Sequence, residues 1–246
     1  MNTLNKASPK YICDGEIEIV KLTKEYQEDA VKLFMENFPK NENFSIATNL
    51  PANPNAIREI EILFREVLRD GISFGAKHIK NGTLAAICAN KLLAPKSNLS
   101  LDDIFLTFTT PEMIFIGNCL EEMENSFDIY KELNIDCSVE VVFLSTRPEF
   151  ERKGIASALT QYSIEFFKDF GNGLFSDEDF PEHIQGKRPK AVCSIFSTKF
   201  TQIIGKKLGF ETVVTRPYTD IEYNGYKFSD KLDPIHNCTT FAIKRL

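Results

Sequence analysis

The chain has 246 residues, of which 43% are hydrophobic and 26% charged, with 12 Gly and 11 Pro. This composition is that of an ordinary globular protein and excludes a disordered or fibrous one. The formal net charge is -6 and no block of Lys and Arg occurs. We therefore expect no nucleic-acid partner, because phosphate contacts need clustered basic residues. A small cationic substrate is easier to accommodate.

The cysteines and apolar stretches indicate the compartment. Six Cys are spread along the chain without a Cys-x-x-Cys motif, and the three His pair with no Cys at zinc spacing. We expect buried thiols in a reducing compartment and no metal. The N-terminal sequence lacks an apolar signal core, and charges interrupt every apolar stretch before the roughly 18 residues that a membrane span needs. The sequence thus predicts a cytoplasmic protein without a membrane partner.

Hydrophobic periodicity predicts alternating strands and helices in the first half of the chain. The expected elements are a strand over 16–22, a helix from Thr23 to about Asn37 that Pro39 ends, and a helix over 55–70 that Gly71 ends. Asn81-Gly82 lies between two strand-like runs and predicts a hairpin with a type I′ turn, in which both central residues have positive φ.

The second half continues the mixture. Residues 101–135 are expected to be helical, with Pro111 near a helix start, and 171–190 has the Gly, Pro, Asp and Lys content of a surface insertion. The other expected elements are strands over 138–147, 190–197, 211–218 and 239–246 and helices over 154–170 and 198–210. One α/β domain over 16–246, after an N-terminal tail over 1–15, is the economical interpretation.

The segment between the strand at 138–147 and the next helix carries the clearest chemical signal. It reads Arg147-Pro-Glu-Phe-Glu-Arg-Lys-Gly154-Ile-Ala156. Small residues at a helix start leave backbone NH groups free at the positive end of the helix dipole, where a diphosphate can bind. Arg152 and Lys153 add positive charge. An ordinary strand-to-helix turn is the alternative.

This segment resembles the pyrophosphate loop of the GNAT superfamily of N-acetyltransferases, Arg/Gln-x-x-Gly-x-Gly/Ala. Gly154 and Ala156 match fixed positions, whereas Glu151 stands where Arg or Gln is usual. The resemblance implies that acetyl-CoA binds to Glu151, Arg152, Lys153, Gly154, Ile155 and Ala156, and that Leu144, Ser145 and Thr146 offer backbone groups to its pantetheine arm. It implies a mixed, twisted sheet of about seven strands flanked by helices.

Further segments are similar to the insect-type arylalkylamine N-acetyltransferases over about 16–246. They are Phe38-Pro-Lys-Asn-Glu42-Asn43, Ser197-Thr-Lys-Phe-Thr201 before Lys207-Leu-Gly-Phe210, Tyr223-Asn-Gly225 and Pro234-Ile-His236. Asn43 for Pro and Thr201 for Ser are departures. The resemblance implies acetyl transfer from acetyl-CoA to a small primary amine, such as dopamine, serotonin or tyramine, by direct attack in a ternary complex that needs no metal.

Two carboxylates compete for the role of general base. An amine with a pKa near 10 is almost wholly protonated at pH 7, so a base is required. Glu42 matches the base of the insect-type family. Glu140 lies on an apolar strand, at the position of the catalytic glutamate in the histone-acetylating branch, and burial there would raise its pKa.

Three more residues are candidates for the site. Ser197 and Thr201 could hold water or protonate the leaving thiolate, although capping of the following helix is an equally good interpretation. His236 could line the amine pocket or pack near the C-terminus. A polyamine or peptide amine remains an alternative acceptor, and a non-catalytic acyl-CoA-binding module remains an alternative function. The sequence leaves the oligomeric state open, a monomer included.

Overall fold

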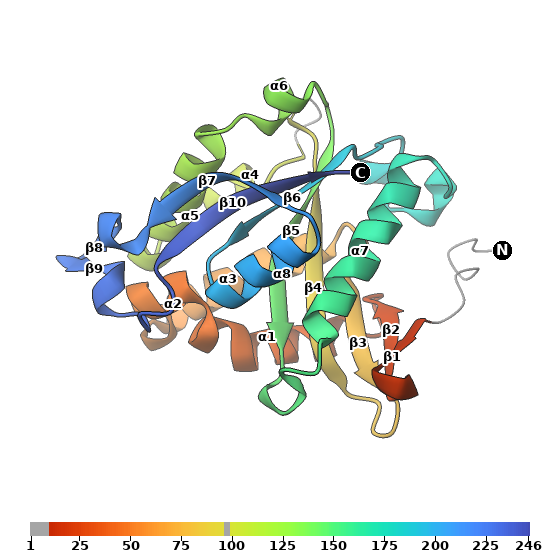
Figure 1. The fold of residues 1–246 in the computed structure, drawn as a ribbon, viewed down its shortest axis with the longest axis horizontal. Helices are drawn as coiled ribbons and strands as arrows, with labels where there is room; N and C mark the ends of the chain where they lie inside the picture. The colour runs from red at the N-terminus through yellow and green to blue at the C-terminus, as the bar shows by residue number, and fades with distance from the viewer. Residues whose placement is uncertain (1–9, 96–98) are drawn as a thin grey trace.

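The computed structural model describes residues 10–95 and 99–246. Its main sheet has eight strands in the order β1-β2-β3-β4-β5-β6-β10-β7 (Figure 1). These are β1 (Lys10–Ile12), β2 (Ile17–Lys21), β3 (Phe74–His78), β4 (Leu84–Leu93), β5 (Ser138–Thr146), β6 (Ala191–Phe196), β10 (Cys238–Arg245) and β7 (Glu211–Pro217). Only the central β5–β6 pair is parallel, so the sheet is mixed as predicted.

The helices cover both faces of this sheet. The longer ones are α1 (Gln27–Asn41), α3 (Pro54–Leu68), α5 (Pro111–Asn125), α7 (Ile155–Gly171) and α8 (Lys199–Lys207). The short ones are α2 (Asn43–Thr48), α4 (Asp102–Phe105) and α6 (Ile129–Leu133), and β8 (Glu222–Tyr223) and β9 (Tyr226–Lys227) form a separate hairpin. Helix α7 crosses the front of the sheet in Figure 1, and α1 and α3 pack behind it.

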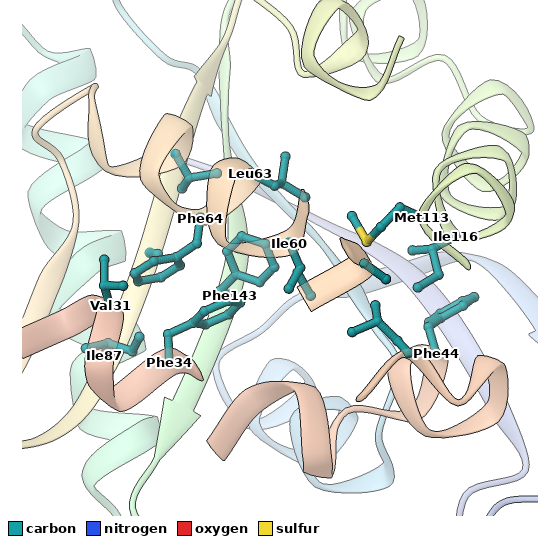
Figure 2. Close-up of a cluster of buried hydrophobic side chains, with 14 of the residues drawn as sticks. Val31, Phe34, Phe44, Ile60, Leu63, Phe64, Ile87, Met113, Ile116 and Phe143 are labelled. Carbon is teal, nitrogen blue, oxygen red and sulfur yellow. The ribbon is translucent and has the colours of Figure 1, made fainter. Parts of the chain in front are cut away.

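Apolar periodicity explains the core between the sheet and α1, α3 and α5. Helix α3 buries Ile60, Leu63, Phe64 and Val67 along one face, as its spacing predicts. Figure 2 shows Phe34 of α1 and Phe64 of α3 beside Phe143 of β5, and the rings of Phe34 and Phe64 are stacked at 4.1 Å between centroids. A second core lies on the other face beneath α7.

Pro39 does not end the first helix. The helix continues to Asn41, because the amide of Glu42 still donates to the Phe38 carbonyl at 3.0 Å and the Asn41 side chain donates to the Asn37 carbonyl at 2.8 Å. Proline removes only one backbone donor, and near the end of a helix that loss is tolerated. The predicted stop at Pro39 is therefore wrong, and the extension brings Glu42 to the junction of α1 and α2.

Two other local predictions need correction. The hairpin of β3 and β4 is present, but only Gly82 has positive φ, so the turn is not type I′. The Asn81 side chain instead accepts from the Thr83 amide at 3.1 Å and holds a longer loop. The segment 171–190 is not wholly on the surface, because Phe180 and Ile184 are buried in the core beneath α7.

The N-terminal segment also differs from the expected tail. Lys10–Ile12 pairs antiparallel with β2 and begins the sheet, while residues 1–9 lie outside the described part. All six cysteines are free, and Cys88, Cys119, Cys137 and Cys193 are buried. No helix in residues 10–95 and 99–246 combines the length and apolar character needed to cross a bilayer.

Candidate active site

A cavity of about 1070 Å³ opens where the centre of the sheet divides. β5 and β6 pair only from Ser138 with Ala191 to Glu140 with Cys193. The Ser194 hydroxyl still donates to the Val141 carbonyl at 2.8 Å, but beyond it no pairing of β6 with β5 occurs in the described structure. The two strands therefore enclose a V-shaped opening whose edges carry backbone groups free to bind a ligand.

The residues expected to meet the pantetheine arm lie on one edge of this opening. Leu144, Ser145 and Thr146 all line the cavity. Their strand pairs with β4 on its other side, where Leu144 lies opposite Cys88 and Thr146 opposite Ala86. One edge of this stretch is therefore held rigidly by the sheet, while the other faces the cavity.

The predicted pyrophosphate loop ends at the start of α7. Arg152 and Gly154 both adopt left-handed backbone conformations, with φ of 60° and 77°. Gly154 is the N-cap of α7 and supplies no side-chain hydrogen bond, and Ile155 anchors the first turn in the core. The first amides of α7 are thus left without a capping side chain at the positive end of a 17-residue helix.

The charged side chains of this loop are exposed. Lys153 places its ammonium 5.1 Å from the centre of the Phe150 ring. Glu151 is among the residues that line the cavity. The other residues predicted to bind the diphosphate, Arg152 to Ala156, are not among the described residues that line the cavity.

Glu42 lies at the cavity wall as the N-cap of α2. Its carboxylate accepts from the amides of Phe44 and Ser45 at 2.9 and 2.8 Å and from the Ser45 hydroxyl at 2.9 Å. These three bonds fix the carboxylate in place and leave lone pairs for a ligand or water. The position of Glu42 thus follows from the extension of α1 past Pro39.

A buried polar network, which the sequence did not reveal, connects Asn43, the residue after Glu42, with Ser197. The side-chain amide of Asn43 donates to the Ser197 carbonyl at 2.7 Å, and the Tyr218 hydroxyl donates to the same carbonyl. Tyr218 is fully buried, and burial raises its pKa, with the nearby Glu42 adding to the effect. Its hydroxyl therefore stays protonated as a donor. This network gives a reason for Asn43 in place of the family's Pro, because proline has no side-chain hydrogen-bond donor.

Ser197 and Thr201 have different environments. Thr198 is the N-cap of α8, and its hydroxyl accepts from the Thr201 amide at 3.1 Å while the Thr201 hydroxyl donates to the Thr198 carbonyl at 3.0 Å. The capping interpretation is thus correct for Thr201, which forms the helix cap together with Thr198. Ser197 precedes the helix, and both Ser197 and Thr201 line the cavity.

His236 lies on the outer side of the α8 N-terminus. Its Nδ1 accepts from the Lys199 amide at 3.0 Å, and its ring meets Phe200 edge-on at 5.3 Å between centroids. Burial lowers the pKa of His236, which favours the neutral ring that accepts this bond. Phe200 lines the cavity, whereas His236 is absent from the described lining residues.

Glu140 lies at the point where β5 and β6 separate. It is 7% exposed and lines the cavity. Burial raises its pKa well above the ordinary value, and the neighbouring Glu124 of α5 adds to this shift. A raised pKa is also what a general base at neutral pH requires, so Glu140 stays a candidate base beside Glu42.

The rest of the wall is apolar and aromatic. Figure 2 shows Phe44, Ile60, Leu63, Met113, Ile116 and Phe143 side by side, and all six also line the cavity. They come from α2, α3, α5 and β5. This wall forms a dry section that suits a ring or a hydrocarbon chain.

Comparison with known proteins shows which solved structures resemble this fold. No protein-family model matches the sequence, and no curated protein is significantly similar to it. Among solved structures, arylalkylamine N-acetyltransferase 2 from Aedes aegypti has a TM-score of 0.73 at 21% identity, over 93% of this chain and 98% of that one. A mosquito arylalkylamine N-acetyltransferase like 5b has a TM-score of 0.75 at 16% identity, over 94% and 100%.

A Drosophila melanogaster polyamine N-acetyltransferase, which forms N-acetylagmatine, has a TM-score of 0.72 at 14% identity, over 94% of this chain and 100% of that one. These structural neighbours are N-acetyltransferases, and they cover nearly the whole chain. The predicted GNAT fold, a single α/β sheet flanked by helices, is confirmed by this likeness.

Proposed function

From a chain with the fold of these acetyltransferases, we propose an enzyme that transfers the acetyl group of acetyl-CoA to a small primary amine. One observation carries the proposal: a single cavity is lined by the free edge of β5, by Glu151 of the loop that leads to the uncapped start of α7, and by Glu42. These are a binding edge for an amide-containing arm, a place for a diphosphate and a candidate base.

The residues divide the chemical work as follows. The thioester of acetyl-CoA supplies the activated acetyl group. Glu42 accepts the proton of the ammonium, directly or through one water, so that the amine nitrogen can attack the carbonyl carbon. The C–S bond then breaks as the C–N bond forms, and the thiolate takes up a proton. Ser197, whose carbonyl accepts from the Asn43 side chain, is the proposed donor of that proton. Thr201 is the second candidate for this role.

The sequence favours an arylalkylamine as acceptor, and the aromatic part of the wall supports a ring. The runner-up, a polyamine, is supported by the carboxylates of the same cavity. Both acceptors share the reaction, so the proposal is tested first at the level of amine acetylation.

The test is a panel of primary amines incubated with acetyl-CoA and read out by release of free thiol. Tyramine, dopamine, pentylamine and spermidine cover the two acceptor classes, and acetyl-CoA affinity is measured separately by calorimetry. We expect thiol release with at least one of these amines. Tight acetyl-CoA binding without acetylation of any amine would instead favour the non-catalytic module, and absence of acetyl-CoA binding would overturn both.

A further inference from the structure

The charged residues among those described as lining the cavity are all acidic. Seven carboxyl side chains line it, and the described lining residues include no Lys, Arg or His. The seven are Glu42, Asp102, Glu121, Glu124, Asp128, Glu140 and Glu151. A concave, partly apolar site with such a lining concentrates cations.

Glu140 is the unusual member of this set. The residue is only 7% exposed, and its carboxylate makes no hydrogen bond or ion pair with any residue in 10–95 or 99–246. Its cross-strand neighbour Lys91 is engaged elsewhere, with its ammonium 2.9 Å from Asp70 and 3.4 Å from Glu66. A buried carboxylate without a partner is costly, so its retention at a cavity wall points to a ligand.

Glu124 supplies a second carboxylate at the same end. It also lacks a side-chain partner within the described residues, and burial raises its pKa to about 7, with Asp102 and Glu121 adding to the shift. Burial raises the pKa of Glu140 well above its ordinary value and Glu124 adds to that shift, while Tyr130 and Cys193 lie near Glu140 as neutral groups whose own pKa values are raised by burial. The free protein thus holds two carboxyl groups together with no cation between them.

The acidic end and Glu42 lie at opposite ends of the apolar wall. Along α5, Met113 and Ile116 precede Glu124, and Met113 and Ile116 lie beside Phe44 of α2, next to Glu42 (Figure 2). Along β5, Glu140 precedes Phe143. Cys193, the β6 partner of Glu140, lies four residues before Ser197, a separation of about 13 Å in an extended strand.

We propose that Glu124 and Glu140 bind a second cationic group of the substrate, so that the acceptor is a linear diamine or guanidinoalkylamine rather than a monoamine. One amine lies at Glu42, the hydrocarbon chain crosses the apolar wall, and the far ammonium or guanidinium meets the two carboxylates. An organic cation fits better than a metal ion, because the described residues bring no three His, Cys, Asp or Glu groups into metal-binding arrangement. The inference rests on the proposed function for the reaction at the first amine.

The experiment compares cadaverine with pentylamine, which has the same five-carbon chain and a single charge. Binding to the full chain in the presence of CoA is measured by calorimetry, and kcat/KM is measured with acetyl-CoA. We expect cadaverine to bind at least about tenfold more tightly, a factor that needs only 1.4 kcal/mol. Its binding should release protons near pH 7 and tighten as the pH rises from 6 to 8, because the two carboxyl groups ionise as the cation arrives.

Variants locate the second site. Glu124→Gln and Glu140→Gln should each reduce the ratio of kcat/KM for cadaverine to kcat/KM for pentylamine at least about fivefold. Glu122→Gln should leave this ratio unchanged. Glu122 lies on the same helix, is exposed, and pairs with Arg216 outside the cavity. If Glu140 is instead the base, its replacement will slow both amines equally and leave the ratio unchanged, which would overturn the inference.

The affinity measurement distinguishes the second-cation site from the proposed acetyl transfer. Equal affinity for cadaverine and pentylamine, with acetylation of both, would overturn the second-cation site and leave the proposed function standing. Preferential binding of cadaverine without acetylation of either amine would support the site and contradict the proposed reaction.

Discussion

Glu42 combines two tasks in one side chain. As the N-cap of α2 it accepts three hydrogen bonds, and at the cavity wall it is the candidate base. A capping residue is held in one rotamer, so the same bonds that start the helix also fix the carboxylate against the ligand space. The network of Asn43, Ser197 and Tyr218 ties this helix start to the loop before α8.

Replacing Glu42 tests the base directly. Glu42→Gln should lower kcat at pH 7 by about a hundredfold or more, the usual scale of general-base catalysis, with acetyl-CoA affinity nearly constant. The amide oxygen still accepts one bond from α2, so a melting curve shows whether the cap survives. Asp29→Asn, an exposed change on α1, is the matched control. A larger loss in Glu140→Gln would assign the base to Glu140.

Gly154 controls the phosphate end of the cavity. Gly154→Asp should weaken acetyl-CoA binding at least about tenfold, because a carboxylate at the start of α7 repels phosphate and competes for the free amides. Nothing lies within 4 Å of an added Cβ, so the effect is one of charge and not of collision. Gly154→Asn has the same shape and tolerates the left-handed conformation comparably, so calorimetry of both variants isolates the charge. Equal affinities for the two variants would contradict this assignment.

At the scale of elements, the sequence predicted what periodicity and spacing control. The helix α3, the strand β5 and the glycine start of α7 lie where they were expected, since each has a strong local signal. It did not predict β1, whose three residues are too short for a pattern, or the passage of α1 through Pro39. It also could not show that Glu124 lies close enough to Glu140 to raise its pKa, because their separation depends on how α5 packs over the sheet.

The start of α8 offers a prediction at this scale. Thr198→Ala removes the capping box with Thr201 and should lower the free energy of unfolding by about 1 kcal/mol. Thr198→Ser retains the hydroxyl and should stay near the wild type. Denaturant unfolding of the three proteins measures the difference, and equal midpoints for Ala and Ser would show that the cap contributes nothing.

For the whole molecule, the acidic end of the cavity makes stability depend on pH. Glu124 and Glu140 have pKa values above 4.5, about 7 for Glu124, so the folded state binds more protons than the unfolded state between about pH 4.5 and 7. These two groups therefore contribute a loss of stability as the pH rises through this window. The surrounding Asp102, Glu121, Tyr130 and Cys193 supply no positive charge to offset it.

Glu124→Gln should therefore be at least about 1 kcal/mol more stable than the wild type at pH 7.5 and indistinguishable from it near pH 4.5. The difference between the two proteins cancels the titration of His236, whose pKa is lowered by burial, and Lys21, whose pKa of about 8 lies above this window. Chemical unfolding at four pH values measures the difference. A constant difference across the range would contradict the raised pKa.

The short parallel pairing between β5 and β6 affects how firmly the two halves of the sheet are held together. Three residue pairs connect two antiparallel blocks, β1 to β5 and β6 with β10 and β7, whereas β4 and β5 share eight pairs. The two blocks are thus joined by few backbone pairs along the line at which the cavity opens. A ligand whose amides hydrogen-bond to both β5 and β6 would take the place of a strand between them. It would join the two blocks into one continuous sheet. Part of its binding free energy would then appear as resistance of the two blocks to separation.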